Sequence, residues 1–301
     1  MSGWCDVPPR FRSGFVALAG RPNTGKSTLL NALCGQKVAI VSDRPQTTRR
    51  AVRGIRNRPG SQVIFVDTPG IHKPRTLLGE RLNSLARGTL AEVDVGLLLV
   101  DAAAGVGKGD AFVARWVLPA CAHALAVVNK TDIASREQVA AALLTLSDMG
   151  DFEEYVPVSA ATGAGVEVLA ELILDRLDEG PMFYPEEMVT DTPLEVTVAE
   201  IVREKLLGRV DDELPHSVAV VVDEIDRRDD GLYQIEARIL VERDSQKGIV
   251  IGAGGSVVRD AGTDARHEIE ALLGAPVYLD LRVAVERDWQ RRPRGLQRMG
   301  F

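Results

Sequence analysis

The chain has 301 residues, enough for about two domains, and its 45% hydrophobic and 26% charged residues are ordinary for a folded protein. A net charge of −7 argues against a protein that coats nucleic acid indiscriminately. Three scattered cysteines and four isolated histidines predict neither a disulfide framework nor a zinc site. No apolar run is long enough to span a membrane, and residues 1–12, which lack an apolar core, are interpreted as a flexible lead-in.

The first motif follows an apolar run, FVALA, of the kind that forms a buried parallel strand. It reads GRPNTGKS from Gly20 to Ser27, and TLLNAL then predicts an amphipathic helix that ends at Gly35. This strand–loop–helix context is what a phosphate loop of the form G-x-x-x-x-G-K-[ST] requires. We expect backbone N–H groups to surround phosphate, Lys26 to reach the β- and γ-phosphates, and the Ser27 hydroxyl to hold Mg²⁺.

A second apolar strand ends in DTPG, which places Asp67 for Mg²⁺ and the Gly70 N–H near a γ-phosphate. Ile71 follows, where Ras-like enzymes carry a glutamine that orients the attacking water, so slow intrinsic hydrolysis is predicted. His72 is interpreted as a solvated structural residue rather than a base. The predicted phosphate site comprises Gly20, Arg21, Pro22, Asn23, Thr24, Gly25, Lys26, Ser27, Thr28, Asp67, Thr68, Pro69, Gly70 and Ile71.

The stretch ALAVVNKTD predicts a strand that delivers Asn129, Lys130 and Asp132 to its carboxyl end. A carboxylate there can accept hydrogen bonds from N1–H and the 2-amino group of guanine, whereas adenine would leave it unpaired. The later stretch YVPVSAATG predicts another strand, after which Ser159, Ala160 and Ala161 can offer a backbone N–H to guanine O6. Together these motifs predict a guanine-nucleotide-binding α/β domain over residues 13–180, with a mostly parallel sheet and helices on both faces.

The order of these motifs resembles that of the translation-factor-related GTPases. DRPQTTRR, residues 43–50, resembles their first switch segment, in which a threonine completes the Mg²⁺ shell when GTP is bound. The resemblance favours Thr48, with Thr47 as the alternative. It also suggests that Asn23 holds K⁺ beside the phosphates. The candidate catalytic residues are Lys26, Thr48, Gly70 and Asn23, and the candidate metal ligands are Ser27, Thr48 and Asp67.

A stretch rich in proline, residues 181–193, is interpreted as a linker. The remainder, 194–301, predicts a helix, a strand, a second strand leading into a glycine turn, a helix and a last strand, which is the order of an α+β type II KH domain. The turn is Gly252-Ala253-Gly254-Gly255, and such turns bind the backbone of single-stranded nucleotides. The predicted RNA-binding residues are Lys247, Ile249, Ile251, Gly252, Ala253, Gly254, Gly255 and Arg259.

A GTPase with this switch, an ELPHSVAVVV strand and a C-terminal KH module resembles the bacterial Era family from Ser13 onward. The resemblance implies a monomeric, cytoplasmic GTPase that uses Mg²⁺, binds 16S ribosomal RNA near its 3′ end during assembly of the 30S subunit, and contacts the inner face of the cell membrane. The variable turn positions, Ala253 and Gly254, lack the lysine usual in the family. Lys247, Arg259 and the arginine-rich C-terminal tail are then expected to supply the positive charge.

Two other functions compete with this one. A GTP-switched adaptor whose C-terminal domain binds protein draws support from the net charge of −6 over residues 190–301. A tRNA-modifying GTPase is disfavoured because no catalytic cysteine or cofactor motif accompanies the switch. RNA recovered with the protein, and the salt dependence of its binding, would separate the adaptor from the RNA-binding GTPase.

Overall fold

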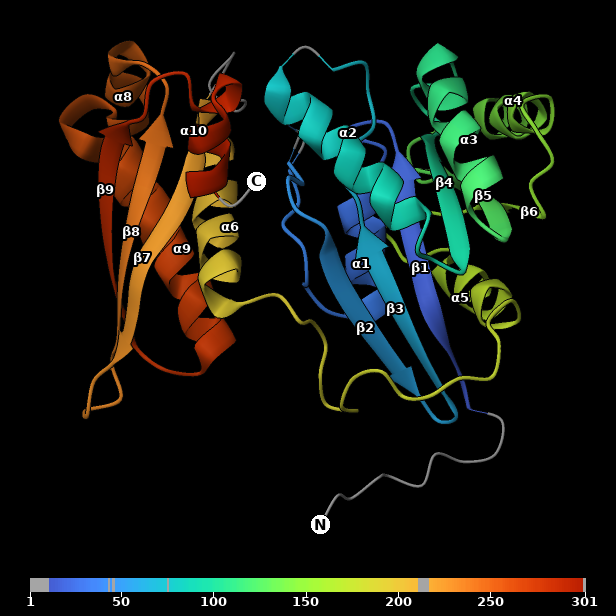
Figure 1. Cartoon of the computed structure of the whole chain (residues 1–301), viewed down its shortest axis with the longest axis horizontal. Helices are drawn as coiled ribbons and strands as arrows, with labels where there is room; N and C mark the ends of the chain where they lie inside the picture. The colour runs from blue at the N-terminus through green and yellow to red at the C-terminus, as the bar shows by residue number, and fades with distance from the viewer. Residues whose placement is uncertain (1–10, 43, 45–46, 75, 211–216, 300–301) are drawn as a thin grey trace. The chain divides into compact units, whose positions relative to one another are not determined.

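A computed structural model of the chain describes residues 11–42, 44, 47–74, 76–210 and 217–299 (Figure 1). Most of the predicted N-terminal lead-in, three residues of the predicted switch segment and the start of the ELPHSVAVVV stretch therefore lie outside the described residues. The chain divides into a first unit, residues 1–39, 48–73 and 82–191, and a second unit, residues 40–47, 74–81 and 192–301. Among the helices that the structure describes, none is long and apolar enough to cross a membrane.

The first unit is built on a six-stranded sheet with the spatial order β2-β3-β1-β4-β5-β6 (Figure 1). Only β2, at one edge, runs antiparallel to its neighbour. This mostly parallel sheet confirms the predicted fold class. Because β1, β3, β4 and β5 run parallel, their carboxyl ends lie on the same side of the sheet. The strands are β1 (Arg12–Gly20), β2 (Val52–Arg58), β3 (Ser61–Asp67), β4 (Val95–Asp101), β5 (His123–Asn129) and β6 (Glu154–Pro157).

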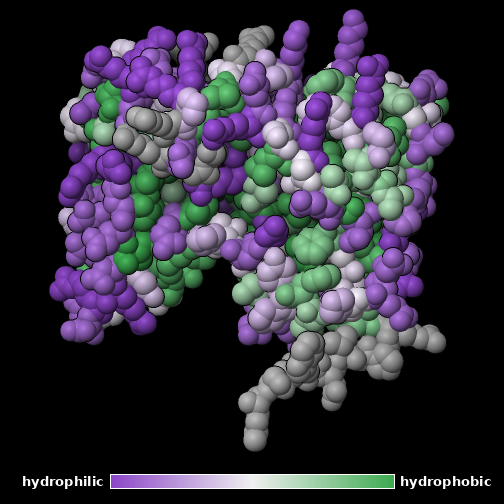
Figure 2. Space-filling model, viewed as in Figure 1, coloured by the Kyte–Doolittle hydropathy of each residue, from purple (hydrophilic) through white to green (hydrophobic). Residues whose placement is uncertain are grey.

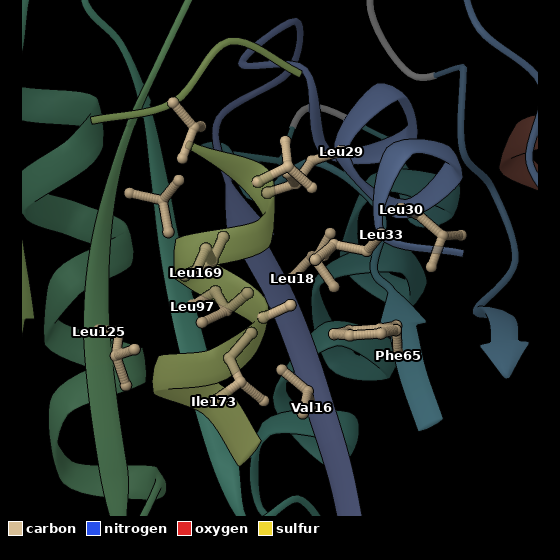
Figure 3. Close-up of a cluster of buried hydrophobic side chains, with 14 of the residues drawn as sticks. Val16, Leu18, Leu29, Leu30, Leu33, Phe65, Leu97, Leu125, Leu169 and Ile173 are labelled. Carbon is tan, nitrogen blue, oxygen red and sulfur yellow. The ribbon is translucent and has the colours of Figure 1, made fainter. Parts of the chain in front are cut away.

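Helices cover both faces of this sheet. Successive side chains of β1 point to opposite faces and are apolar on both, so each face is buried under helices. Val16 and Leu18 pack against α1 (Lys26–Cys34) and α5 (Val166–Leu174), in the cluster that Figure 3 shows. Ala17 and Ala19 belong to the opposite cluster, with α2, α3 and α4. These three helices are α2 (Leu77–Leu90), α3 (Lys108–Ala120) and α4 (Arg136–Ser147). The first helix ends, as predicted, at Gly35, which has a left-handed φ of 71°.

The stretch interpreted as a linker is bonded to the first unit along residues 181–191, a segment we call the strap. Gln62, on β3, is fully buried. Its Oε1 accepts hydrogen bonds from the N–H groups of Phe183 and Tyr184 at 2.8 and 3.0 Å, and its Nε2 donates to the Tyr184 carbonyl at 2.8 Å. The Ile55 N–H, on β2, donates to the Val189 carbonyl at 2.9 Å. The strap therefore follows the antiparallel edge of the sheet.

The second unit contains a three-stranded sheet with the order β7-β8-β9, in which β8 is antiparallel to β7 and parallel to β9. Apolar side chains of α6 and α9 pack on one face of this sheet. Figure 2 shows hydrophilic residues gathered at the β7–β8 turn, where Arg228 pairs with Asp230 at 3.1 Å. The elements are α6 (Leu194–Leu207), β7 (Ala219–Arg227), β8 (Tyr233–Val241), α8 (Asp244–Ile251), η1 (Ala253–Gly255), α9 (Ser256–Leu273), β9 (Val277–Val285), η2 (Trp289–Arg291) and α10 (Pro293–Arg298).

One predicted element of the second unit is wrong. The second strand was expected to continue to the glycine turn, but it ends at Val241 and residues 244–251 form the helix α8. The Gln246 side chain caps this helix by accepting hydrogen bonds from the N–H groups of Glu242 and Arg243 at 2.9 and 3.0 Å. The apolar residues of KGIVIG were interpreted as part of a buried strand. In the structure they belong to α8, of which only Val250 is buried. This side-chain cap stabilises the start of α8, and the pattern of apolar residues does not reveal it.

The arginine-rich C-terminal stretch is folded onto the second unit rather than extended. Trp289 is fully buried, and its Nε1 donates a hydrogen bond to the Ser217 carbonyl at 3.1 Å. Leu296, on α10, is also fully buried. Burial of the Trp289 indole removes a large apolar area from water, and its N–H keeps a hydrogen-bond partner. Both effects stabilise the folded position of this terminal segment. The exposed arginines Arg291 and Arg292 are thus carried on ordered backbone.

Candidate functional site

The predicted phosphate loop, residues 20–28, begins at the last residue of β1, passes through the connection 21–25 and ends in the first turn of α1, which contains Thr28. Two of its residues have left-handed backbone, Asn23 with φ 66° and Gly25 with φ 90°. A Cβ at Gly25 would lie 2.3 Å from Nδ2 of Asn129, so only glycine fits. The loop therefore has the tight backbone that lets N–H groups approach phosphate.

The Lys26 side chain lies inside this loop and is 6% exposed. Its Nζ donates hydrogen bonds to the carbonyls of Arg21 at 2.8 Å and Gly20 at 3.3 Å. Burial lowers the pKa of Lys26 to about 8, although the nearby Asp67 carboxylate opposes the shift. A phosphate bound beside this amine would favour its charged form.

Asp67, at the end of β3, lies at the centre of the cluster of predicted metal ligands. Its Oδ2 accepts hydrogen bonds from Ser27 Oγ at 2.6 Å and from Thr48 Oγ1 at 3.0 Å, and the two hydroxyl oxygens are 3.0 Å apart. The carboxylate is fully buried, and its Oδ1 has no hydrogen-bond partner in the part of the chain that the structure describes. Burial raises the pKa of Asp67, against the attraction of Lys26. An unpaired buried carboxylate oxygen beside two hydroxyls suits a Mg²⁺ ion.

The two candidate switch threonines differ in position. Thr48 reaches Ser27 and Asp67, whereas the Thr47 hydroxyl donates to the Arg44 carbonyl at 2.6 Å. The side chain of Thr47 is therefore engaged within its own segment. Of the two alternatives left open by the sequence, Thr48 is the one brought to the other predicted metal ligands.

The segment after β3 packs closely against the phosphate loop. A Cβ at Gly70 would lie 2.9 Å from the Pro22 nitrogen, and the Ile71 N–H donates to the Gly20 carbonyl at 3.1 Å. The Ile71 side chain is 1% exposed and joins the apolar cluster under α2 and α3, so it does not face water. Thr68 is also buried, and its hydroxyl donates to the Leu18 carbonyl at 2.8 Å.

The predicted base-binding residues meet at the ends of β5 and β6. Asn129 is 1% exposed; its Nδ2 donates to the Thr24 carbonyl at 2.8 Å, and its Oδ1 accepts from the Ala160 N–H at 3.0 Å. The Ser159 hydroxyl donates to Asp132 Oδ1 at 2.7 Å. Asn129 thus joins the phosphate loop to the loop after β6, and Ser159 orients the carboxylate that was predicted to read guanine. The exposed Ala161 follows directly in the same loop.

Lys130 takes a different position from its motif neighbours. It has a left-handed φ of 65°, and its Nζ forms an ion pair with Asp101 Oδ2, at the end of β4, at 2.7 Å. That ion pair holds the amine near the end of β4. Only the aliphatic part of the Lys130 side chain can then pack against a base.

In the second unit, the glycine turn joins α8 to α9. Three of its residues have left-handed backbone, Gly252, Gly254 and Gly255, with φ of 73°, 58° and 76°. A Cβ at Gly252 would lie 2.6 Å from Cγ2 of Val257, whereas Cβ atoms at Gly254 and Gly255 would point into open space. The last two glycines therefore leave the turn accessible to a ligand backbone.

A groove of about 290 Å³ lies beside this turn, between α9 and β9. Of the predicted RNA-binding residues only Arg259 lines it; Lys247, Ile249 and Ile251 lie on α8. The sequence reasoning missed the other lining residues, although their spacing of three and four along α9 and of two along β9 marks one face of each element. The missed residues are Val258, Gly262, Thr263, Arg266, Leu279 and Leu281.

The fold and the two sites define a P-loop GTPase joined to a type II KH domain. Family models agree with both halves: a 50S ribosome-binding GTPase model matches residues 15–130, and a KH domain model matches residues 213–290. The chain belongs to the GTPase Era family. It is 53% identical to GTPase Era of Mycobacterium avium (strain 104) over 97% of this chain and 99% of the relative, and 52% identical to that of Nocardioides sp. (strain ATCC BAA-499 / JS614), with 97% of each covered.

Two solved structures of Era resemble the whole chain. One, of Era in complex with MgGDPNP and nucleotides 1506–1542 of 16S ribosomal RNA, is 40% identical, has a TM-score of 0.93, and covers 96% of this chain and 99% of its own. The other, a variant of Aquifex aeolicus Era bound to GDP and AlF4⁻, is 39% identical, has a TM-score of 0.92, and has the same coverage. The fold of both units is thus a known GTPase Era fold.

Proposed function

We propose that this GTPase binds and hydrolyses GTP and binds 16S ribosomal RNA near its 3′ end, in assembly and maturation of the small (30S) ribosomal subunit. The observation that carries the proposal is the likeness, over 96% of the chain, to an Era bound to both a GTP analogue and 16S RNA. The matching family model is named for 50S ribosome binding but covers only residues 15–130. We give more weight to the full-length relative, whose RNA belongs to the small subunit.

In the nucleotide site, each residue takes a role that its position supports. Lys26 would exchange its two carbonyl contacts for phosphate oxygens, and Asp132, oriented by Ser159, would accept the two guanine N–H groups. Ser27, Thr48 and Asp67 would hold Mg²⁺, which when bound neutralises charge on the phosphates. Their three oxygens already lie within 3.0 Å of one another, so little rearrangement of side chains is needed.

Hydrolysis should be slow without help, because the buried Ile71 cannot orient water. We propose that Asn23, exposed and in left-handed backbone at the loop, holds K⁺ beside the phosphates. Single-turnover hydrolysis in matched KCl and NaCl, with Asn23→Ala as control, tests this. A rate that is higher in KCl only for the parent protein supports the ion; equal rates in the two salts would refute it.

The RNA site would combine the open glycine turn with the groove between α9 and β9. Single-stranded bases can pack on Val258, Leu279 and Leu281 while phosphates pass over Gly254 and Gly255. Because Ala253 and Gly254 supply no positive charge, we assign the phosphate contacts to Arg259 and Arg266, the cations among the residues that line the groove. Arg259 has a side chain 67% exposed, so it can turn toward a phosphate.

The remaining parts of the proposal follow from the family alone. We place the protein in the cytoplasm as a monomer with peripheral contact to the inner face of the cell membrane. Fractionation of cells in low and high salt would test this location, since peripheral binding through charge weakens as salt rises.

Crosslinking in cells, followed by sequencing of the bound RNA, tests the central proposal. Enrichment of the 3′ end of 16S RNA, lost when Gly255 is replaced by Asp, is the expected result. Recovery of protein partners with no enriched RNA would instead favour the GTP-switched adaptor.

A further inference from the structure

Arg21, the second residue of the phosphate loop, is held by a buried carboxylate of α3. Its Nε donates to Asp110 Oδ1 at 2.7 Å, and its Nη2 donates to the Gly105 carbonyl at 3.2 Å. Asp110 is fully buried, and its Oδ2 accepts the Gly107 N–H at the N-terminus of α3 at 2.9 Å. One carboxylate therefore fixes both the start of α3 and the guanidinium of the loop.

The local sequence of α3 makes room for this contact. A Cβ at Gly109, in the first turn of the helix, would lie 2.4 Å from Cδ of Arg21. The aliphatic stem of Arg21 therefore lies directly on the backbone of α3. The side chain is fixed at both its apolar and its charged end, which restricts the rotamers open to it.

The main chain of the same residue contacts the reactive end of the loop. The Arg21 carbonyl accepts hydrogen bonds from Lys26 Nζ at 2.8 Å and from Thr24 Oγ1 at 3.0 Å. The position of this carbonyl thus sets where the Lys26 amine lies before a nucleotide arrives. Because the Arg21 side chain is anchored on α3, the Cα of Arg21 has little room to move, which limits how far the neighbouring carbonyl can shift.

We infer that Arg21 and Asp110 form a positioning pair, which ties the phosphate loop to α3 and holds it in the shape that binds nucleotide. The inference rests on residues 20–28 being the phosphate loop. The guanidinium of Arg21 is not free to contact phosphate, since leaving Asp110 would strand a buried carboxylate without its partner, which is strongly unfavourable. The pair therefore acts on binding through the shape of the loop.

This role predicts a particular pattern of effects. A loop that cradles the phosphates common to GDP and GTP would lose affinity for both nucleotides alike. Once nucleotide is bound, its phosphates also hold the loop, so affinity should fall by a larger factor than the hydrolysis rate at saturation. We expect about a tenfold loss of affinity, which corresponds to about 1.4 kcal/mol.

The test compares Arg21→Ala, Asp110→Asn and the double variant in the full-length protein. Asp110→Asn keeps an oxygen for the Gly107 N–H, so the cap of α3 survives. Fluorescent GDP and a fluorescent non-hydrolysable GTP analogue report affinity, and single-turnover hydrolysis reports the rate at saturation. The double variant should bind about as weakly as either single variant, because the two residues act as one unit. Arg21→Lys, which keeps the charge, should recover part of the affinity.

Arg176→Ala is the matched control, because it removes another partly buried arginine of the first unit, paired with Glu153 and Glu154 at 2.7 and 3.0 Å. It should lower the melting temperature without changing nucleotide affinity. Additive losses in the double variant, a loss for the GTP analogue alone, or affinities that follow melting temperature in all variants would each overturn the inference. Lys26→Ala tests the phosphate-loop assignment separately from the role of the Arg21–Asp110 pair. If this variant binds nucleotide normally, the assignment itself is wrong.

Discussion

Replacing Thr48 with alanine should weaken binding of a GTP analogue far more than binding of GDP. The Thr48 hydroxyl lies 3.0 Å from both Ser27 Oγ and Asp67 Oδ2, at the place proposed for Mg²⁺. The switch threonine is expected to join the metal shell only when the γ-phosphate is present. A nucleotide with two phosphates should therefore lose little when the hydroxyl is removed.

The size of the effect follows from the loss of one contact to a charged group. Such a contact contributes about 1.5–3 kcal/mol, which corresponds to roughly a 10- to 150-fold weaker affinity for the GTP analogue. Thr47→Ala is the matched control, because it removes a hydroxyl bonded only to the neutral Arg44 carbonyl among the described contacts. That change should cost about 0.5–1.5 kcal/mol of local stability and leave the preference between the two nucleotides unaltered.

Titration of both variants with fluorescent GDP and a fluorescent GTP analogue in Mg²⁺ gives the ratio of the two affinities. The reasoning is refuted if Thr48→Ala weakens the two nucleotides equally, or if Thr47→Ala changes the ratio more than Thr48→Ala does.

Three other outcomes are expected. Asp132→Asn should move the preference from GTP toward xanthosine triphosphate, because the amide suits an oxygen at position 2; a variant that still prefers GTP in competition binding contradicts the base assignment. Gly255→Asp should weaken binding of a short single-stranded RNA by about 1–3 kcal/mol in fluorescence anisotropy without changing GTP binding, and unchanged RNA affinity would leave the turn without a role. Since burial raises the pKa of Asp67 and Mg²⁺ requires the ionised carboxylate, Mg²⁺-dependent affinity should rise with pH through that raised pKa, whereas an affinity that does not change with pH on the acid side would contradict the role of this carboxylate.

The residues predicted for the nucleotide site lie together because they follow strand ends. Parallel strands bring their carboxyl ends to one edge of the sheet, so Lys26, Asp67 and Asn129 meet although more than a hundred residues separate the first from the last. Glycine spacing and the apolar runs before each motif indicate this placement in the sequence; the roles of the residues stay predictions.

What the sequence did not predict depends on side-chain contacts between distant segments. The ion pair of Arg21 with Asp110 and the bonds of Gln62 to the strap join residues 89 and more than 120 positions apart, and no local pattern marks them. The helix α8 was missed because its capping residue, Gln246, acts through hydrogen bonds that hydrophobic periodicity does not reveal. The groove beside the glycine turn was missed for a related reason, since it forms only where α9 meets β9.

The strap also bears on how the protein avoids aggregation. β2 is an edge strand, and an open edge offers unpaired N–H and C=O groups to strands of other molecules. Along this edge the Ile55 N–H is bonded to Val189, and Asn57 Nδ2 donates to the carbonyls of Glu186 and Met188 at 2.6 and 3.3 Å. The strap thus occupies sites that a second chain would use. A GTPase domain cut before Pro181 would expose this edge and self-associate, whereas one that extends to Asp191 would keep its own edge covered.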